Sequence, residues 1–78
     1  MKLTYDRDLN IAYLRLKPKG DQVETVRVSD ELNVDLAPDG SVYGIELLNA
    51  NHQLREADDG RLIVVDPRSG EERSLKVA

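Results

Sequence analysis

The chain contains no cysteine, no tryptophan and no phenylalanine among its 78 residues, and it has one histidine and one methionine. Disulfides and Cys-ligated zinc are therefore excluded, and one histidine cannot build a histidine-rich metal site. A domain this small buries only about 60% of its unfolded surface and usually needs additional stabilisation by disulfides, a metal or a partner subunit. We therefore expect self-association, as a homodimer, and no metal or cofactor.

Basic charge is also scarce. Lys and Arg number 11 against 15 Asp and Glu, which gives a net charge of -4. Binding to a phosphate backbone needs clustered basic residues, so this balance disfavours nucleic acid as a partner. No apolar run approaches the roughly 20 residues of a membrane span, and the start is charged from Lys2, unlike a signal peptide. We expect a cytoplasmic protein without a membrane partner.

A period of two dominates the first two-thirds of the chain, in short stretches rich in β-branched residues and tyrosine. This pattern predicts a mainly β fold, an antiparallel meander of about five to seven short strands with one short helical turn near residues 50–58. We expect a single domain, 1–78, with a β core (1–50), a loop or short helix (51–60) and a C-terminal β-hairpin (61–78). The expected strands are residues 2–5, 11–16, 23–29, 32–36, 41–48, 61–65 and 72–77.

The sharpest local signal is the sequence Ala-Pro-Asp-Gly-Ser at residues 37–41. Pro presets φ and Gly supplies the left-handed residue of a hairpin turn with a bulge. If residue 37 faces residue 41, then Val34 faces Gly44 and Leu32 faces Glu46, whereas a four-residue loop would slip the pairing by one residue. The first register leaves the fifth strand apolar on both sides.

Tyr43, Ile45 and Leu47 share one side of that strand in this register, opposite the side that faces the Leu32 layer. A strand that is apolar on both sides is covered on both faces. The second cover is either the C-terminal segment or a second copy of the chain. We take Tyr43, Ile45 and Leu47 as the candidate interface.

The motifs also resemble those of a prokaryotic family catalogued as domain of unknown function 2283. The resemblance rests on Tyr5-Asp6, on the Ala-Tyr-Leu-x-Leu run at residues 12–16, and on Val34-Asp35, Asp39-Gly40 and Gly44-Ile45-Glu46. It covers about two-thirds of the chain, and the departures are at Asn10 and Asn49, where the family often has Asp. It implies a compact β-rich domain with no assigned activity, and an antitoxin-like role beside a small neighbouring protein as one hypothesis.

Glu46 is the candidate ionisable centre, because the same register places its carboxylate beside Leu32 and Leu48 on a mostly apolar face. A desolvated carboxylate has a raised pKa and can act as a general acid or base. The structural alternative is a Glu that pairs with an Arg or a Tyr hydroxyl. Asp35 falls on the opposite face in this register, which excludes a shared carboxylate pair.

The other polar residues have plainer interpretations. Asp6 and Asp8 flank a turn, where carboxylates commonly bond their own backbone. His52 could be a base or a ligand with Glu56, but nothing completes a metal triad. Gly44 makes room for a ring, that of Tyr5 or Tyr13.

Two functions follow from these patterns. The leading hypothesis is a non-enzymatic protein–protein interaction domain, a homodimer that presents a sheet face or edge to another small protein. The alternative is a small-molecule binder or an enzyme that uses Glu46. No catalytic, cofactor or metal motif is present to favour the alternative.

Overall fold

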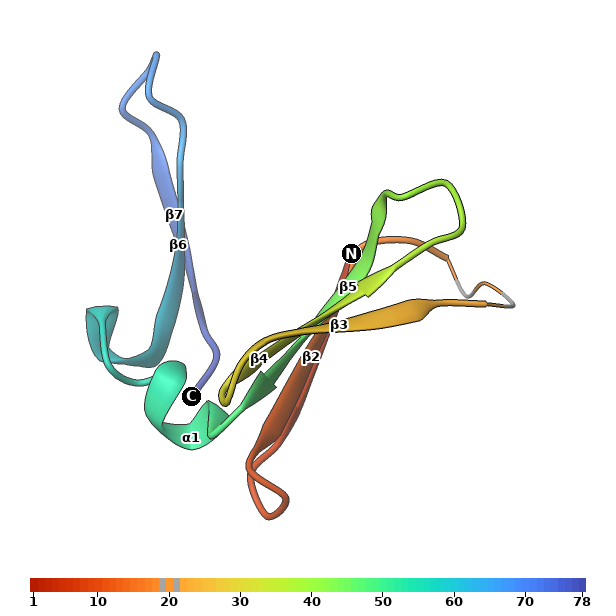
Figure 1. Cartoon of the computed structure of the whole chain (residues 1–78). Helices are drawn as coiled ribbons and strands as arrows, with labels where there is room; N and C mark the ends of the chain where they lie inside the picture. Colours follow the sequence, from red (N-terminus) through yellow and green to blue (C-terminus); the bar gives the residue numbers. More distant parts are fainter. Residues whose placement is uncertain (19, 21) are drawn as a thin grey trace.

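The computed structural model describes residues 1–18, 20 and 22–78, and the described part is mainly β, as the sequence predicts. Seven strands, one helical turn (α1) and one 3-10 turn (η1) follow one another along the chain (Figure 1). The expected helical turn near residues 50–58 is present, and each strand lies within a residue of its expected position. The elements are β1 (Lys2–Asp6), β2 (Ile11–Arg15), β3 (Glu24–Ser29), β4 (Leu32–Leu36), β5 (Val42–Leu48), α1 (Ala50–Gln53), η1 (Asp58–Gly60), β6 (Arg61–Val65) and β7 (Glu72–Lys76).

The strands form two separate antiparallel sheets. The larger has the order β1-β2-β5-β4-β3, and β6 pairs only with β7. The larger sheet is therefore not a simple meander, because β2 pairs with β5 and not with β3. We call residues 16–18, the described start of the connection from β2 to β3, the crossing segment.

The turn at residues 37–41 forms as predicted. Ala37 N–H donates to the carbonyl of Ser41 at 2.8 Å, Gly40 has φ +86°, and Leu36 lies opposite Val42. Beyond that pair the predicted register is wrong by one residue, because Tyr43 occupies a bulge and Asp35 faces Gly44. A bulge inserts one unpaired residue, so every later residue of the strand changes partner.

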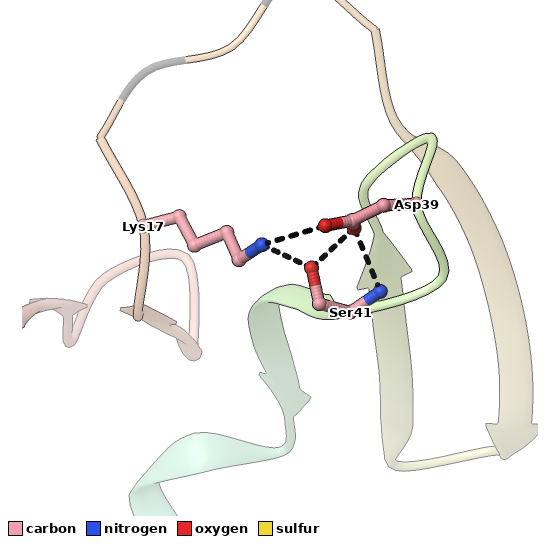
Figure 2. A network of polar contacts seen from close by, with 3 residues as sticks. All are labelled: Lys17, Asp39 and Ser41. Atoms are coloured by element: carbon pink, nitrogen blue, oxygen red, sulfur yellow. Dashed lines mark hydrogen bonds and ion pairs between the residues drawn. The ribbon is translucent and has the colours of Figure 1, made fainter.

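The crossing segment is hydrogen-bonded both to the carbonyl of the bulge residue Tyr43 and to the turn at residues 37–41. Tyr43 O accepts the N–H of Leu16 at 2.9 Å and that of Lys17 at 3.4 Å. Figure 2 shows the Lys17 ammonium reaching the turn, where it bonds the hydroxyl of Ser41 and lies 3.6 Å from Asp39 Oδ2. The Asp39 carboxylate also accepts the N–H of Ser41 at 3.0 Å, so the turn and the crossing segment are joined by one polar network.

At the other end of the sheet, asparagine side chains form hydrogen bonds between α1 and the hairpin of the first two strands. Asn10 and Asn49 both adopt left-handed backbone conformations, with φ of 59° and 53°, which asparagine tolerates better than most residues. Asn10 Nδ2 donates to Asn49 Oδ1 at 3.3 Å, and Asn10 Oδ1 accepts the N–H of Asn51 at 2.7 Å. Asn51 in turn accepts the hydroxyl of Tyr5. These bonds fasten α1 to the β1–β2 turn.

Very little of the chain is buried. The buried apolar residues of the described part are Ala12, Ala50 and Ala78, and none of its large side chains is fully buried. The chain exposes 5989 Å², whereas a compact monomer of this mass is expected to expose about 4,800 Å². The radius of gyration is 14.0 Å, against about 11.5 Å for a compact domain of this length. The described part of the chain therefore has only a small buried core.

The β6–β7 hairpin stands apart from the sheet. Figure 1 shows hairpin and sheet as two arms that diverge from the region of α1. At its base, Gly60 O accepts the N–H of Val77 at 2.9 Å and that of Ala78 at 3.0 Å. Among the described residues, no hydrogen bond joins β6 or β7 to the larger sheet.

No helix in the described ranges is long and apolar enough to cross a membrane.

Candidate interaction surface

One side of the five-stranded sheet is apolar, and the observed register defines its members. Ile45 of β5 lies between Leu14 of β2 and Val34 of β4. Leu47 lies in the same way between Ala12 and Leu32. Residues directly opposite in an antiparallel pair share a face. We call this side the apolar face; its residues are Leu3, Tyr5, Ala12, Leu14, Val26, Leu32, Val34, Leu36, Val42, Ile45 and Leu47.

The apolar face is only partly shielded within one copy. Ile45, Leu47 and Val34 are half-buried, and the edge residues Leu3 and Val26 are 38% and 40% exposed. In a sheet with one covered face, the central residues of that face belong to a core and are buried. Among the described residues, no second sheet therefore covers the apolar face.

The interface residues predicted from the sequence are divided by the structure. Ile45 and Leu47 lie together, but on the same side as Leu32 and Val34, whereas the sequence placed them on the opposite side. This correction follows from the bulge at Tyr43. Tyr43 itself lies outside the alternation of β5 and lines an open hollow with Lys17 and Pro18.

The other side of the sheet is polar, and its centre is Tyr13. The Tyr13 hydroxyl donates to Asp35 Oδ2 at 2.6 Å, and the Thr25 hydroxyl donates to Asp35 Oδ1 at 2.6 Å. The ring lies over Gly44, where a Cβ would come within 2.7 Å of Tyr13 Cε1, so the room predicted at Gly44 is taken by Tyr13. Burial, and then the bond to Asp35, raise the pKa of Tyr13 well above its usual value.

Glu46 lies on this polar side, opposite Asn33 and Tyr13. Its predicted position beside Leu32 on an apolar face is wrong, for the same register reason. Asn33 Nδ2 donates to Glu46 Oε1 at 3.0 Å. Asp35 lies on this side too, so the prediction that it and Glu46 occupy opposite faces is also wrong. Each of these two carboxylates accepts a hydrogen bond from a neighbouring side chain.

The remaining polar candidates lie away from the sheet faces. Asp6 Oδ1 accepts the N–H groups of Asp8 and Leu9 at 3.0 Å each, which is the turn role predicted for it. His52 Nε2 lies 3.7 Å from Glu56 Oε2, and both side chains are more than half exposed. In the described part of the chain, no three His, Asp or Glu side chains gather into a possible metal site.

The hairpin carries a set of exposed aliphatic residues that the sequence reasoning did not single out. The signal was present in the run Leu-Ile-Val-Val at residues 62–65, which lacks the polar alternation of an exposed strand. The exposed aliphatic residues of the hairpin are Leu62 (49%), Ile63 (38%), Val64 (61%), Val65 (50%) and Leu75 (65%).

Sheet order, register and the half-bare apolar face define a small antiparallel β protein. The model of the family described as Protein of unknown function (DUF2283) matches residues 2–51. The chain belongs to this family, and the resemblance seen in its sequence motifs is confirmed. The matched segment contains the five-stranded sheet and the start of α1, and it ends before the hairpin. No curated protein and no solved structure matches the chain.

Proposed function

We propose that the protein is a non-enzymatic interaction domain that forms a homodimer through the apolar face of its sheet. The observation that carries the proposal is the small size of the core: no large side chain of the described part is fully buried. A two-sheet assembly supplies the second layer that a sheet with one apolar face needs.

The exposed area supports a second copy as the occupant. The chain exposes about 1,200 Å² more than a compact monomer of its mass would. Specific complexes bury about 800 Å² on each partner, and permanent homodimers bury more. Burial of the excess on both copies would thus form an interface of the size found in permanent homodimers.

The polar side of the sheet also supports this proposal, because its polar side chains are paired with one another and do not form a ligand site. Tyr13, Asp35 and Glu46 each have a hydrogen-bond partner within the sheet. Among the described residues, no buried side-chain polar atom lacks a partner. An unpaired polar group aimed into a pocket would favour a ligand site, and the described part offers none.

The finer form of the proposal is an antitoxin-like role, in which the homodimer binds a small neighbouring protein. A free strand edge suits such a partner, because an extended segment can add to it through main-chain hydrogen bonds. β3 forms one edge of the sheet, and all of its residues are exposed.

The test of the homodimer is the double substitution Ile45→Asp and Leu47→Asp, followed by sedimentation velocity. Two buried carboxylates at the centre of the face should abolish the dimer, since an unpaired charge there is strongly disfavoured. The control is Lys2→Asp with Thr4→Asp, which also introduces two carboxylates, here on the polar side of β1, and should leave the dimer intact.

A milder variant separates dissociation from unfolding. Val26→Asp lies at the edge of the apolar face, where its side chain is 40% exposed, and should weaken the dimer while the circular dichroism of the sheet persists. A native particle that remains dimeric with both Ile45 and Leu47 changed would show that the apolar face is not the interface.

A further inference from the structure

We propose that the β6–β7 hairpin is an exchanged arm, which packs on the apolar face of the sheet of a second copy, while the hairpin of that copy packs on the first. This inference rests on the proposed homodimer and names the segment that covers the face. The arm is defined as residues 61–76, the two strands and their turn.

The hairpin needs a cover as much as the sheet does. Isolated two-stranded hairpins are marginally stable at best in water. All ten residues of β6 and β7 are exposed. Backbone hydrogen bonds at the turn and at the base of the hairpin involve six residues, but they cover none of the side chains. The hairpin therefore needs another surface to cover it, and the five-stranded sheet of the same copy does not pack against it in this structure.

The register shows which side of the arm would pack. Leu62 lies opposite Leu75 and Val64 opposite Arg73, so these four residues share one side. Three of the four are aliphatic. The opposite side pairs Arg61 with Lys76, Ile63 with Ser74 and Val65 with Glu72, so only two of its six residues are aliphatic. The Leu62–Leu75 side is thus the natural one to meet an apolar face.

Exchange of the arms accounts for both exposed surfaces, the apolar face of the sheet and the Leu62–Leu75 side of the arm. If the two sheets packed face to face, the dimer would leave the aliphatic side of both arms in water. If each arm packed on the other copy's sheet, both surfaces would be covered by one two-fold contact, in which each patch meets its complement twice. The excess area of the chain includes both surfaces, so covering both accounts for more of it.

Charge agrees with this arrangement. The hairpin holds four of the 11 basic residues and three of the 15 acidic ones, so it is net positive and the rest of the chain net negative. Contact between arm and sheet of different copies therefore brings opposite net charges together, which favours association. The basic residues are Arg61, Arg68, Arg73 and Lys76, and the acidic ones are Asp66, Glu71 and Glu72.

The absence of cysteine makes the test direct, since any disulfide must form between introduced residues. Full-length Leu75→Cys and full-length Val34→Cys, one of them carrying an affinity tag, are unfolded together, refolded as a mixture and oxidised mildly. We expect a disulfide between Cys at 75 of one chain and Cys at 34 of the other, identified by mass spectrometry as the main cross-linked product.

Two matched controls come from neighbouring positions. Ser74→Cys lies on the opposite side of the same strand of the arm, and Thr4→Cys lies on the polar side of the sheet. Mixtures of Ser74→Cys with Val34→Cys, or of Leu75→Cys with Thr4→Cys, should give at least tenfold less hetero-disulfide. Equal yields in the test and control mixtures would mean random collision and would overturn the exchange.

Sedimentation of the native chain, taken together with the disulfides formed by the variants, separates the two proposals. A dimer whose disulfide joins two copies of Val34→Cys, with none between positions 34 and 75, would retain the homodimer and overturn the exchanged arm. A monomeric native chain would overturn both. A dimer that gives the hetero-disulfide only in the expected mixture supports both.

Discussion

The five-stranded sheet and the C-terminal hairpin are built from similar strands but reach different degrees of burial. β5 has a neighbour on each side, and its residues are buried or half-buried. β6 is as rich in aliphatic residues, has one neighbour, and all its residues are exposed. Strand formation thus follows from local sequence, whereas burial needs further partners that local sequence does not supply. The hairpin also lies outside the residues that match the family.

The sharpest way to test this comparison is one substitution in each region. Gly44→Ala brings a methyl group against the ring of Tyr13 and should lower the free energy of unfolding by about 2–3 kcal/mol. Gly70→Ala meets nothing within 4 Å, and its cost of about 1 kcal/mol should come only from the φ of +75°. Urea unfolding at one fixed protein concentration measures both.

Equal losses for the two glycine variants would contradict the comparison, because they would mean that the ring of Tyr13 is not held over Gly44.

A smaller effect is expected from Tyr13→Phe, which removes the bond to Asp35 and should cost about 1 kcal/mol. The raised pKa of Tyr13 means that its contribution is fully present below the unfolded value of 10.0 and is lost as pH rises towards the folded value. The difference in stability between the native chain and Tyr13→Phe should therefore shrink above about pH 10.

Tyr43→Phe is the control for this experiment, since no side-chain hydrogen bond of the Tyr43 hydroxyl occurs among the described residues. Its stability relative to the native chain should change little at neutral pH. A loss as large as that of Tyr13→Phe would show that the polar side of the sheet is not organised around Tyr13.

The smallest expected effect compares the two turns. The Ser41 hydroxyl and N–H hold the pKa of Asp39 below its usual value, and the N–H of Arg68 does the same for Asp66 in the hairpin. Stability from a lowered pKa is present above the unfolded value of 3.8 and is lost as pH falls through the folded value. Asp39→Asn and Asp66→Asn should each flatten the acid side of a plot of melting temperature against pH.

If neither Asn variant changes that plot between about pH 2 and 5, the local bonds of the turns do not contribute to stability.

Much of the fold could be predicted because its signals are local. The period of two located the strands, the Pro-Asp-Gly sequence located the turn before β5, and the missing side chain of Gly44 indicated a ring. The bulge at Tyr43 could not be found in this way, because one unpaired residue leaves no mark on composition. It alone moved Glu46 and Ile45 to the other sides of the sheet, and with them the predicted surroundings of the candidate site.

The strand order could not be predicted either, since periodicity describes a strand's faces and not its neighbours. The left-handed backbone at Asn10 and Asn49 was not predicted, although asparagine tolerates this conformation better than most residues. The apolar character of the candidate interface, by contrast, was predictable from Ile45 and Leu47, because their identity does not depend on the register. The exposure of the aliphatic residues of the hairpin could not be predicted, because it depends on whether another surface packs against them.

If the proposed homodimer forms, the exposed apolar face of the sheet links the folding of this protein to its abundance. A chain that gains its second layer only from another copy completes its folding when the two meet, so its refolding rate and its folded fraction rise with concentration. At low expression such a chain spends longer with its aliphatic strands open to proteases, and its steady-state level falls more steeply than its synthesis. The exposure of the apolar face of the sheet would thereby set a threshold for the amount of the protein in the cell.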